Sequence, residues 1–439
     1  KVKHMKRNAL ESLIRWKSSE DRKPMVLKGA RQVGKTWLMK EFGRLAYDSF
    51  VYFNFDEEEE LKSIFEANKN PQRIVELLSL IAGEKILPEK TLIIFDEIQE
   101  VPKALTSLKY FHENAPQYAI VAAGSLLGVA LHQGTSFPVG KVDFLDLYPL
   151  NFREFLCAMG EKQFVSMLDS CDTQMVTVFK TKYIERLREY YFVGGMPEVV
   201  KDFSEKKDYN RVRAIQKNLI NYYQQDFSKH AEIKLVPRLN LVWNSIPMQL
   251  AKENKKYIYG QVREGSRAKD FELAIQWLLD CGLIHKVQRI QKPDLPLKAY
   301  IDFDAFKLFL VDIGLLIAMT DLDAKVIIEG NKIFTEFKGS LTEQYILQQL
   351  ISDVGVIPYY YSTQNSKGEI DFLVQGKTSV IPIEVKAEEN LKAKSLKAFC
   401  EKYQPSYAVR TSMSDYREQD WMTNIPLYAI KWIENYVNQ

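Results

Sequence analysis

The chain has 439 residues, of which 46% are hydrophobic and 27% are charged, so we expect two to four globular domains. This composition excludes a disordered or fibrous chain. The formal net charge of +3 excludes a globally basic nucleic-acid-binding protein and leaves room only for a local basic patch.

The first 150 residues alternate between strand-like and helix-like segments. Four apolar runs predict buried strands, at residues 24–29, 49–55, 91–97 and 118–125, and helical patterns follow the first three. This alternation is typical of a parallel sheet that is covered by helices. We therefore predict an α/β domain over residues 1–150.

A nucleotide-binding loop follows the first predicted strand. The segment GARQVGKT has the G-x-x-x-x-G-K-[ST] spacing and lies between a strand and a helix. In this motif, backbone N–H groups and the helix N-terminus bind phosphates, the lysine bridges the β- and γ-phosphates, and the hydroxyl binds Mg²⁺. We therefore predict ATP and Mg²⁺ as cofactors. The predicted contact residues are Gly29, Ala30, Arg31, Gln32, Val33, Gly34, Lys35, Thr36 and Trp37.

The third and fourth predicted strands end in polar residues that belong to the same candidate site. The third ends in Asp96 and Glu97, and the carboxyl ends of parallel strands meet at one edge of a sheet. Asp96 would hold Mg²⁺ through water, and Glu97 would be the catalytic residue that polarises the attacking water. The fourth ends in Ser125, a candidate sensor of the γ-phosphate. The alternatives are an acidic helix cap for the first two residues and an ordinary polar strand end for Ser125.

The middle of the chain has a different pattern. After Pro149, residues 151–230 read as amphipathic helices. Residues 231–329 combine helices with two short β-runs, at residues 285–290 and 298–303, which are the parts of a winged helix.

The predicted winged-helix segment carries a local excess of positive charge. Residues 252–298 include ten basic and six acidic side chains. In a winged helix, basic residues such as Arg263, Arg267 and Lys269 meet the phosphates of DNA or RNA. A structural role, or docking to another protein, explains the same pattern equally well, so both readings stay open.

The last segment, residues 330–439, is predicted to be a second α/β domain. If residues 376–379 form a four-residue hairpin loop, Asp371 lies opposite Glu384 and Lys386 shares their face of the sheet. Residues Ile381, Ile383 and Val385 would form the buried face, and Pro382 would place the strand at a sheet edge or a bulge.

This hairpin is the second candidate site. Two carboxylates and a lysine so close together, beside Glu343 on a preceding helix, would repel one another unless a divalent cation lay between them. We therefore expect Glu343, Asp371 and Glu384 to bind a metal ion. The alternative is a charged, solvated hairpin face with a simple salt bridge.

Six segments of the chain carry a resemblance to a known family. They are GARQVGKTWLMKEF, LIIFDEIQEVPKALTSLKYF, AAGSLL, VDFLDLYPLNFREFL, FVGGMPEVV and LPLKAYIDFDAFKLFLVDIGLL. They resemble the bacterial and archaeal AAA+-like P-loop ATPases with a C-terminal restriction-endonuclease-like, or PD-(D/E)xK, domain. The resemblance implies a P-loop core at residues 1–150, a helical segment at 151–230, a winged-helix-like domain at 231–329 and a restriction-endonuclease-like α/β domain at 330–439.

The resemblance also implies roles for individual residues. In the restriction-endonuclease-like fold, Mg²⁺ and a lysine activate water, so Asp371, Glu384 and Lys386 would be catalytic. The chain departs from the family at Gly140 and Lys141, where the family carries a Gly-Arg pair. A lysine cannot make the forked contacts of an arginine finger, and Arg153 is a substitute candidate.

The cysteines and the apolar segments indicate a cytoplasmic protein. The four cysteines are far apart and include no C-x-x-C pair, so neither a zinc site nor a disulfide framework is expected. The longest apolar stretch, residues 119–131, is shorter than the roughly 18 to 20 residues of a membrane span. The first ten residues are basic and lack the apolar region of a secretory signal.

Two functions of different classes fit these features. The first is an ATPase that acts on or near nucleic acid, with DNA or RNA cut or held by the terminal domain. The second is a signalling switch, in which ATP shifts the arrangement of domains and an inactive nuclease-like domain only binds a partner. ATP is the expected ligand in both, and a homo-oligomer is compatible with both.

Overall fold

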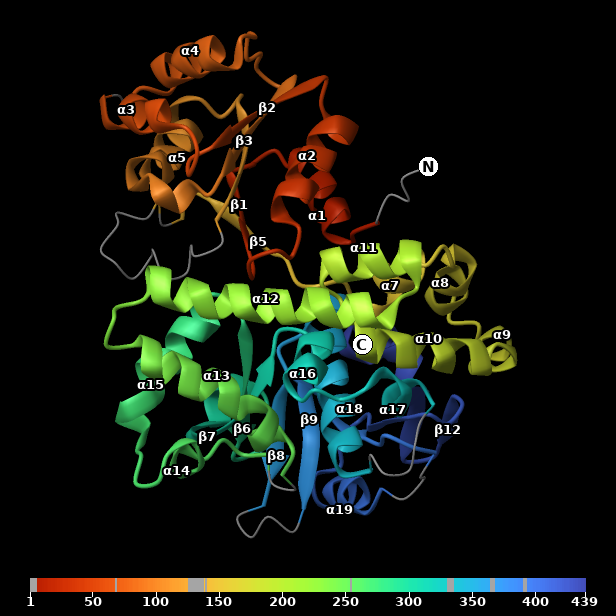
Figure 1. The fold of residues 1–439 in the computed structure, drawn as a ribbon. Coiled ribbons are helices and arrows are strands. Elements are labelled where there is room, and N and C mark those ends of the chain that lie inside the picture. Colours follow the sequence, from red (N-terminus) through yellow and green to blue (C-terminus); the bar gives the residue numbers. More distant parts are fainter. Residues whose placement is uncertain are drawn as a thin grey trace. The chain divides into compact units, whose positions relative to one another are not determined.

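The computed structural model describes residues 6–67, 69–124, 138, 140–252, 255–329, 335–363, 368–389 and 393–439 (Figure 1). They form two compact units. The N-terminal unit consists of residues 6–148 with 280–283, and the C-terminal unit consists of residues 149–279 with 284–439. The division at residues 150, 230 and 329 that the sequence indicates stays a prediction.

The N-terminal unit is built on a five-stranded parallel sheet with the order β2-β3-β4-β1-β5. The strands are β1 (Met25–Lys28), β2 (Ser49–Asn54), β3 (Thr91–Asp96), β4 (Ala119–Ala123) and β5 (Asp143–Asp146). The helices are α1 (Ala9–Lys17), α2 (Lys35–Ala46), α3 (Glu59–Ala67), α4 (Pro71–Ala82) and α5 (Pro102–Asn114). The four predicted strands are confirmed, whereas β5 and α4 were not predicted.

The core of the N-terminal unit explains why the apolar runs form strands. Val26, Phe53, Ile93, Phe95 and Ile120 come from four neighbouring strands and are buried in one hydrophobic cluster. Because a parallel sheet is covered on both faces, its central strands β3 and β4 are continuously buried rather than alternating. Their carboxyl ends therefore present the loop after β1 and the acidic end of β3 at the same edge.

The first part of the C-terminal unit is helical, as predicted for residues 151–230. Its helices are α7 (Phe152–Ala158), α8 (Lys162–Asp169), α9 (Thr173–Val178), α10 (Lys180–Val193), α11 (Pro197–Lys206) and α12 (Tyr209–His230). The helices α13 (Val236–Leu250), α14 (Tyr259–Val262) and α15 (Ala268–Asp280) follow. Later helices are α16 (Ile313–Met319), α17 (Ala324–Ile328), α18 (Thr335–Gln349), α19 (Lys394–Tyr403) and α20 (Glu434–Val437).

An eight-stranded sheet with the order β12-β13-β11-β10-β9-β8-β6-β7 joins the rest of this unit. Its strands are β6 (Ile284–Ile290), β7 (Ile301–Leu310), β8 (Tyr359–Ser362), β9 (Glu369–Gln375), β10 (Val380–Val385), β11 (Val409–Ser412), β12 (Arg417–Gln419) and β13 (Met422–Pro426). The two β-runs expected at residues 285–290 and 298–303 correspond to the antiparallel pair β6–β7, and β6 also pairs in parallel with β8. The hairpin therefore belongs to the same sheet as the strands of the terminal segment.

The predicted register of the β9–β10 hairpin is confirmed. Gln375 pairs with Val380 and Leu373 pairs with Pro382, which places Asp371 opposite Glu384. The backbone N–H of Val385 donates to the carboxylate of Asp371 over 2.7 Å.

Two expectations about this hairpin are wrong. Strand β10 lies between β9 and β11, so Pro382 marks neither an edge nor a bulge. The parallel ladder with β11 begins only at Ile383, so the missing N–H of Pro382 removes no bond from it. Both faces of β10 are buried, and Glu384 is only 4% exposed. The hairpin is therefore not a solvated surface feature.

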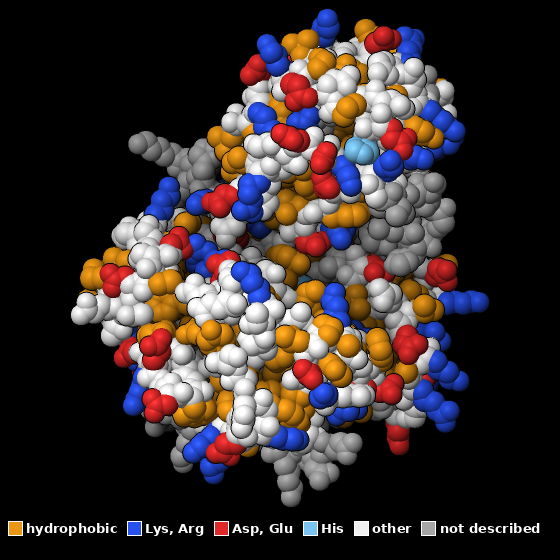
Figure 2. Space-filling view, turned by 180° about the vertical axis from the view of Figure 1, so that it is seen from behind, with side chains coloured by type: hydrophobic (Ala, Val, Ile, Leu, Met, Phe, Trp, Pro, Cys, Tyr) orange, Lys and Arg blue, Asp and Glu red, His pale blue; other side chains and the backbone are white. Residues whose placement is uncertain are grey.

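The surface carries charges of both signs. Figure 2 shows Lys and Arg side chains interspersed with Asp and Glu over the face that it draws, in line with the small net charge of +3. Within the described part of the chain, no helix is both long enough and apolar enough to cross a membrane.

Candidate functional site

The loop between β1 and α2 has a backbone that only certain residues can adopt. Gly29 has φ of +142° and Gly34 has φ of +93°. A Cβ atom on Gly29 would lie 2.1 Å from the carbonyl oxygen of Leu147, so only glycine fits there. The loop curls around Lys35, whose Nζ donates to the carbonyl oxygens of Gly29 over 2.8 Å and of Ala30 over 2.9 Å.

Lys35 is buried, and its ammonium group donates hydrogen bonds only to backbone carbonyl groups. Burial lowers the pKa of Lys35 to about 8, although the carboxylates of Glu97 and Asp96 act in the opposite direction. Its present partners are neutral carbonyl groups, which stabilise the ammonium less than phosphate oxygens would. The environment of Lys35 therefore fits the binding of a polyphosphate.

Thr36 and Asp96 form the candidate magnesium site. The hydroxyl of Thr36 donates to the carboxylate of Asp96 over 2.5 Å, and the hydroxyl of Tyr52 donates to the same oxygen over 3.0 Å. A hydroxyl and a buried carboxylate in contact are oxygen donors of the kind that Mg²⁺ takes beside a nucleotide. These residues therefore fit the ion. Tyr52 was not predicted, because its proximity to Asp96 follows from the pairing of β2 with β3.

Glu97 lies directly after β3, in a left-handed conformation with φ of +50°. Its carboxylate accepts a hydrogen bond of 2.8 Å from the side-chain amide of Gln99. It makes no capping hydrogen bond to the 3₁₀ turn Ile98–Glu100, which is contrary to the helix-cap alternative. Gln99 thus orients the candidate catalytic carboxylate. This role of Gln99 was not predicted from the sequence. Ser125, the candidate sensor, lies outside the described residues.

Lys141, at the position where the family carries arginine, and Arg153, the substitute candidate, are both engaged with carboxylates. Lys141 Nζ lies 3.0 Å from Glu113. The guanidinium of Arg153 lies 2.9 Å from Asp353 and also pairs with Asp169. Arg153 is therefore held inside the C-terminal unit, which is contrary to a role as a substitute finger.

The second candidate site is a cluster of carboxylates and lysines in the C-terminal unit. Three predicted carboxylates converge there, Glu343 from α18, Asp371 from β9 and Glu384 from β10, and α18 contacts β10. Lys386 Nζ lies 2.6 Å from Glu384, as its place on the same face predicts.

Two further lysines complete this carboxylate–lysine cluster. Lys255 pairs with Glu343, and Lys307 on β7 pairs with Glu369 while lying 3.7 Å from Glu343. Neither lysine was predicted. A signal for Lys307 is present in the sequence, because it is the single charge in the run AFKLFLV, whereas nothing local marks Lys255. The repulsion that suggested a metal ion is therefore relieved by lysines.

The electrostatics of the cluster follow from its burial. Burial and the neighbouring Glu343 raise the pKa of Asp371 well above its usual value. Burial would also raise the pKa of Glu343, but Lys255 and Lys307 outweigh it and lower that pKa. The negative charge of this pair therefore resides on Glu343, beside the lysines.

Two carboxylate oxygens of the cluster are buried and accept no hydrogen bond, namely Glu343 Oε2 and Glu384 Oε2. The first of them lies 3.7 Å from Lys307 Nζ, so an ion pair already compensates its charge. In the described ranges, no three His, Cys, Asp or Glu side chains form a ready-made metal-binding group.

A match to a known family bears on the first site. Residues 21–156 match the family model of an AAA domain. This segment is therefore similar to AAA domains. Residues 184–326 and 338–430 match two domains of unknown function, DUF8612 and DUF4143. No curated protein matches the chain.

Solved structures show weaker similarity. The Walker-type ATPase PABY2304 of Pyrococcus abyssi is 14% identical, with 73% of this chain and 100% of that chain covered and a TM-score of 0.46. The Aeropyrum pernix ORC1 protein, solved in complex with DNA, is 13% identical, with 71% and 91% covered and a TM-score of 0.27. TM-scores this low do not establish a shared overall fold.

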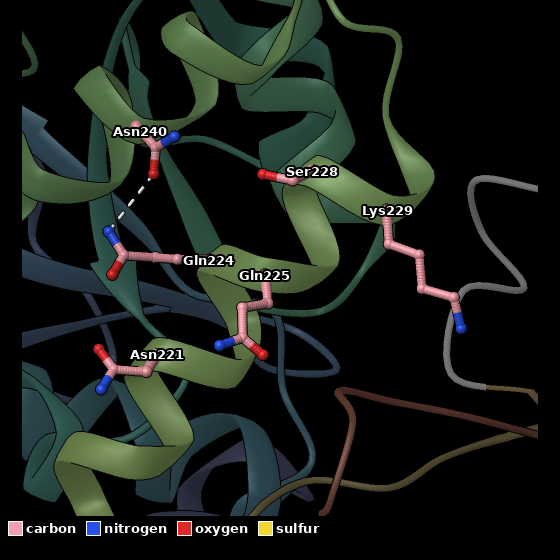
Figure 3. Close-up of a pocket in the computed structure, with 6 residues that line it drawn as sticks. All are labelled: Asn221, Gln224, Gln225, Ser228, Lys229 and Asn240. Carbon is pink, nitrogen blue, oxygen red and sulfur yellow. Dashed lines mark hydrogen bonds between the residues drawn. The ribbon is translucent and has the colours of Figure 1, made fainter.

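A polar cavity outside both sites lies on α12 and α13. It has a volume of about 710 Å³ and is lined by Asn221, Gln224, Gln225, Ser228, Lys229 and Asn240. Figure 3 shows the amide of Gln224 directed at Asn240, to which it donates over 3.3 Å. The carboxamides offer both donors and acceptors of hydrogen bonds, but nothing in the lining selects one ligand.

Proposed function

We propose that the chain is an ATPase whose nucleotide state controls a C-terminal nuclease-like domain that acts on or binds nucleic acid. The observation that best supports ATPase activity is the arrangement of Lys35, Thr36 and Asp96. Lys35 and Thr36 follow the candidate phosphate-binding loop, and the Thr36 hydroxyl contacts Asp96. Together with the AAA-domain match, this arrangement supports ATP and Mg²⁺ as ligands. Glu97 then accepts a proton from, or orients, the attacking water.

The carboxylate–lysine cluster supports the nuclease-like half of the proposal. Glu343, Asp371 and Glu384 would hold Mg²⁺, which when bound would polarise water and offset charge on a phosphodiester. Lys386, 2.6 Å from Glu384, would place its ammonium beside the reacting group and stabilise negative charge there.

One observation favours the second function, a switch with an inactive nuclease-like domain. Lys255 and Lys307 already neutralise the carboxylate of Glu343. A cluster that is neutralised from within needs no metal ion to be stable, and it can serve as a rigid part of a binding domain. The two functions therefore differ in whether the cluster takes up a metal.

The experiment that separates them uses the whole protein with plasmid DNA and Mn²⁺ or Mg²⁺, with and without ATP. Nicking that disappears in Asp371→Ala, together with ATP hydrolysis that disappears in Glu97→Gln, is the result expected from the proposal. ATP hydrolysis without nicking or DNA binding would instead leave the switch function. The variant Asp304→Ala, at an acidic residue on β7 outside the cluster, is the control for nicking.

A further inference from the structure

The short segment Asp280–Leu283 connects α15 with β6 but belongs to the N-terminal unit. The side chains of Cys281 and Leu283 are buried. Between them, Gly282 has φ of +69°, a left-handed conformation that residues with a Cβ atom rarely adopt. The chain therefore contributes a sharp, largely buried turn to the N-terminal unit before it enters β6 at Ile284.

Gly282 lies against the start of the nucleotide loop, residues 29–36. A Cβ atom at Gly282 would lie 3.1 Å from the backbone nitrogen of Ala30 and 3.5 Å from the carbonyl carbon of Gly29. The first distance is shorter than ordinary van der Waals contact, so the loop would have to move by a few tenths of an ångström. The loop can therefore keep its position only if residue 282 is glycine.

The part of the loop beside Gly282 is the part that holds Lys35. The ammonium of Lys35 donates to the carbonyl oxygens of Gly29 over 2.8 Å and of Ala30 over 2.9 Å. A displacement of these two residues would move both acceptors of the lysine. The position of Gly282 therefore bears directly on the group that is expected to bind phosphate.

The other connection to the C-terminal unit is also tied to the nucleotide loop. The guanidinium of Arg7 donates to the carbonyl oxygen of Val33 in the loop over 3.0 Å and to that of Tyr148 over 2.5 Å. Tyr148 is the last residue of the N-terminal unit before the chain enters the C-terminal unit at Pro149. The loop is thus linked, directly or through Arg7, to both places where the chain leaves the N-terminal unit.

We propose that Gly282 is a positioning residue of the ATP site, and that the segment Asp280–Leu283 transmits displacements of the nucleotide loop to α15 and β6. The inference rests on the proposed ATP binding, and it adds a route by which the nucleotide state reaches the C-terminal unit. Because α15 ends at Asp280 and β6 begins at Ile284, a shift of the segment moves the ends of both elements. The coupling is reciprocal, so a ligand that moves α15 also changes the affinity for ATP.

The first test is calorimetric titration of the whole protein with ATP and Mg²⁺. Gly282→Ala should bind ATP about 3- to 10-fold more weakly, because a misplacement of about 1 Å can cost about 100-fold and this one is a few tenths of an ångström. Gly265→Ala is the matched control, since Gly265 has φ of +76° but a Cβ atom there would meet nothing within 4 Å. It introduces similar backbone strain without pressing on the loop, so it should bind ATP as the unchanged protein does.

Hydrogen–deuterium exchange separates transmission from a merely structural role. ATP with Mg²⁺ should slow the exchange of backbone amides in residues 280–290 of the unchanged protein, because a loop held by phosphates restrains the segment packed against it. At saturating ATP this protection should persist in Gly265→Ala and be smaller in Gly282→Ala. The measurement on the unchanged protein decides the transmission even if Gly282→Ala does not fold.

The outcomes distinguish the inference from the proposed function. Equal ATP affinities of Gly282→Ala and Gly265→Ala would overturn the role of Gly282 and leave the ATP site standing. If ATP binds to the unchanged protein but does not alter the exchange of residues 280–290, the transmission to α15 and β6 is wrong. If the unchanged protein binds no ATP, the proposed ATP site itself is wrong, and the inference falls with it.

Discussion

The hydroxyl of Thr36 donates to the carboxylate of Asp96 over 2.5 Å and so connects the end of the nucleotide loop with the end of strand β3. Thr36 lies on α2, which follows β1, and β1 is not a neighbour of β3 because β4 lies between them. The contact between Thr36 and Asp96 therefore depends on the whole sheet, and it aligns two oxygen donors before any ligand arrives.

This contact predicts how magnesium supports nucleotide binding. In Asp96→Asn, a carboxylate that would hold the ion becomes a neutral amide, so ATP should bind with nearly the same affinity in the presence and absence of Mg²⁺. Calorimetry with MgCl₂ or EDTA measures the difference. Asp56→Asn, at an exposed position after β2, is the control and should keep the Mg²⁺ dependence of the unchanged protein.

Lys35 should carry a large part of the affinity for ATP. Hydrogen bonds to charged groups contribute about 1.5–3 kcal/mol, so Lys35→Ala should weaken ATP binding by roughly 10- to 100-fold. Lys62→Ala, at an exposed lysine of α3, should bind ATP normally. Equal affinities of all three proteins would remove Lys35 from the phosphate site.

The lowered pKa of Lys35 predicts a pH effect with a definite sign. In the empty site the lysine loses its proton near pH 8, and phosphate oxygens would raise its pKa. Between about pH 8 and the usual value of 10.5, ATP binding should therefore be accompanied by proton uptake. Titrations at pH 9 in two buffers of different ionisation enthalpy would show this as different binding heats. The difference should be absent in Lys35→Ala.

Glu97 should separate hydrolysis from binding. Glu97→Gln keeps the shape of the side chain but removes the carboxylate, so ATP should still bind while steady-state hydrolysis falls by a factor on the order of 10² or more. Glu66→Gln, at an exposed position of α3, is the control. Phosphate release that is unchanged in Glu97→Gln would show that another group orients the water.

The features that the sequence predicted well are those encoded locally. The loop before α2, the strand that ends in Asp96, and the register that sets Asp371 opposite Glu384 all follow from spacing over a few residues. Strand β5 was missed because DFLD alternates exposed and partly buried residues and lacks an apolar run.

The features that were missed depend on contacts distant in sequence. Lys255 lies 88 residues and Lys307 lies 36 residues before Glu343 in the sequence, and no local pattern predicts such pairs. The strand with Pro382 was expected at an edge because only its own residues were considered, whereas β11 arrives from further along the chain. Tertiary contacts thus decided the burial of Glu384 and the charge balance of its neighbourhood.

A final prediction concerns nucleic acid and the helix α15. Arg263, Arg267 and Lys269 are all exposed and lie around its N-terminus, where backbone N–H groups also favour phosphate. If this region contacts DNA, binding should weaken steeply with salt, because each neutralised phosphate releases counterions. Changing all three residues to Glu should weaken binding further and flatten the salt dependence, as measured by fluorescence anisotropy of a labelled duplex.

The control changes Lys62, Lys85 and Lys90 of the N-terminal unit to Glu, which alters the net charge equally. If both triple variants lose affinity to the same extent, the effect comes from net charge, and α15 has no specific role. Binding that does not respond to salt would favour the use of this region as a protein-docking surface.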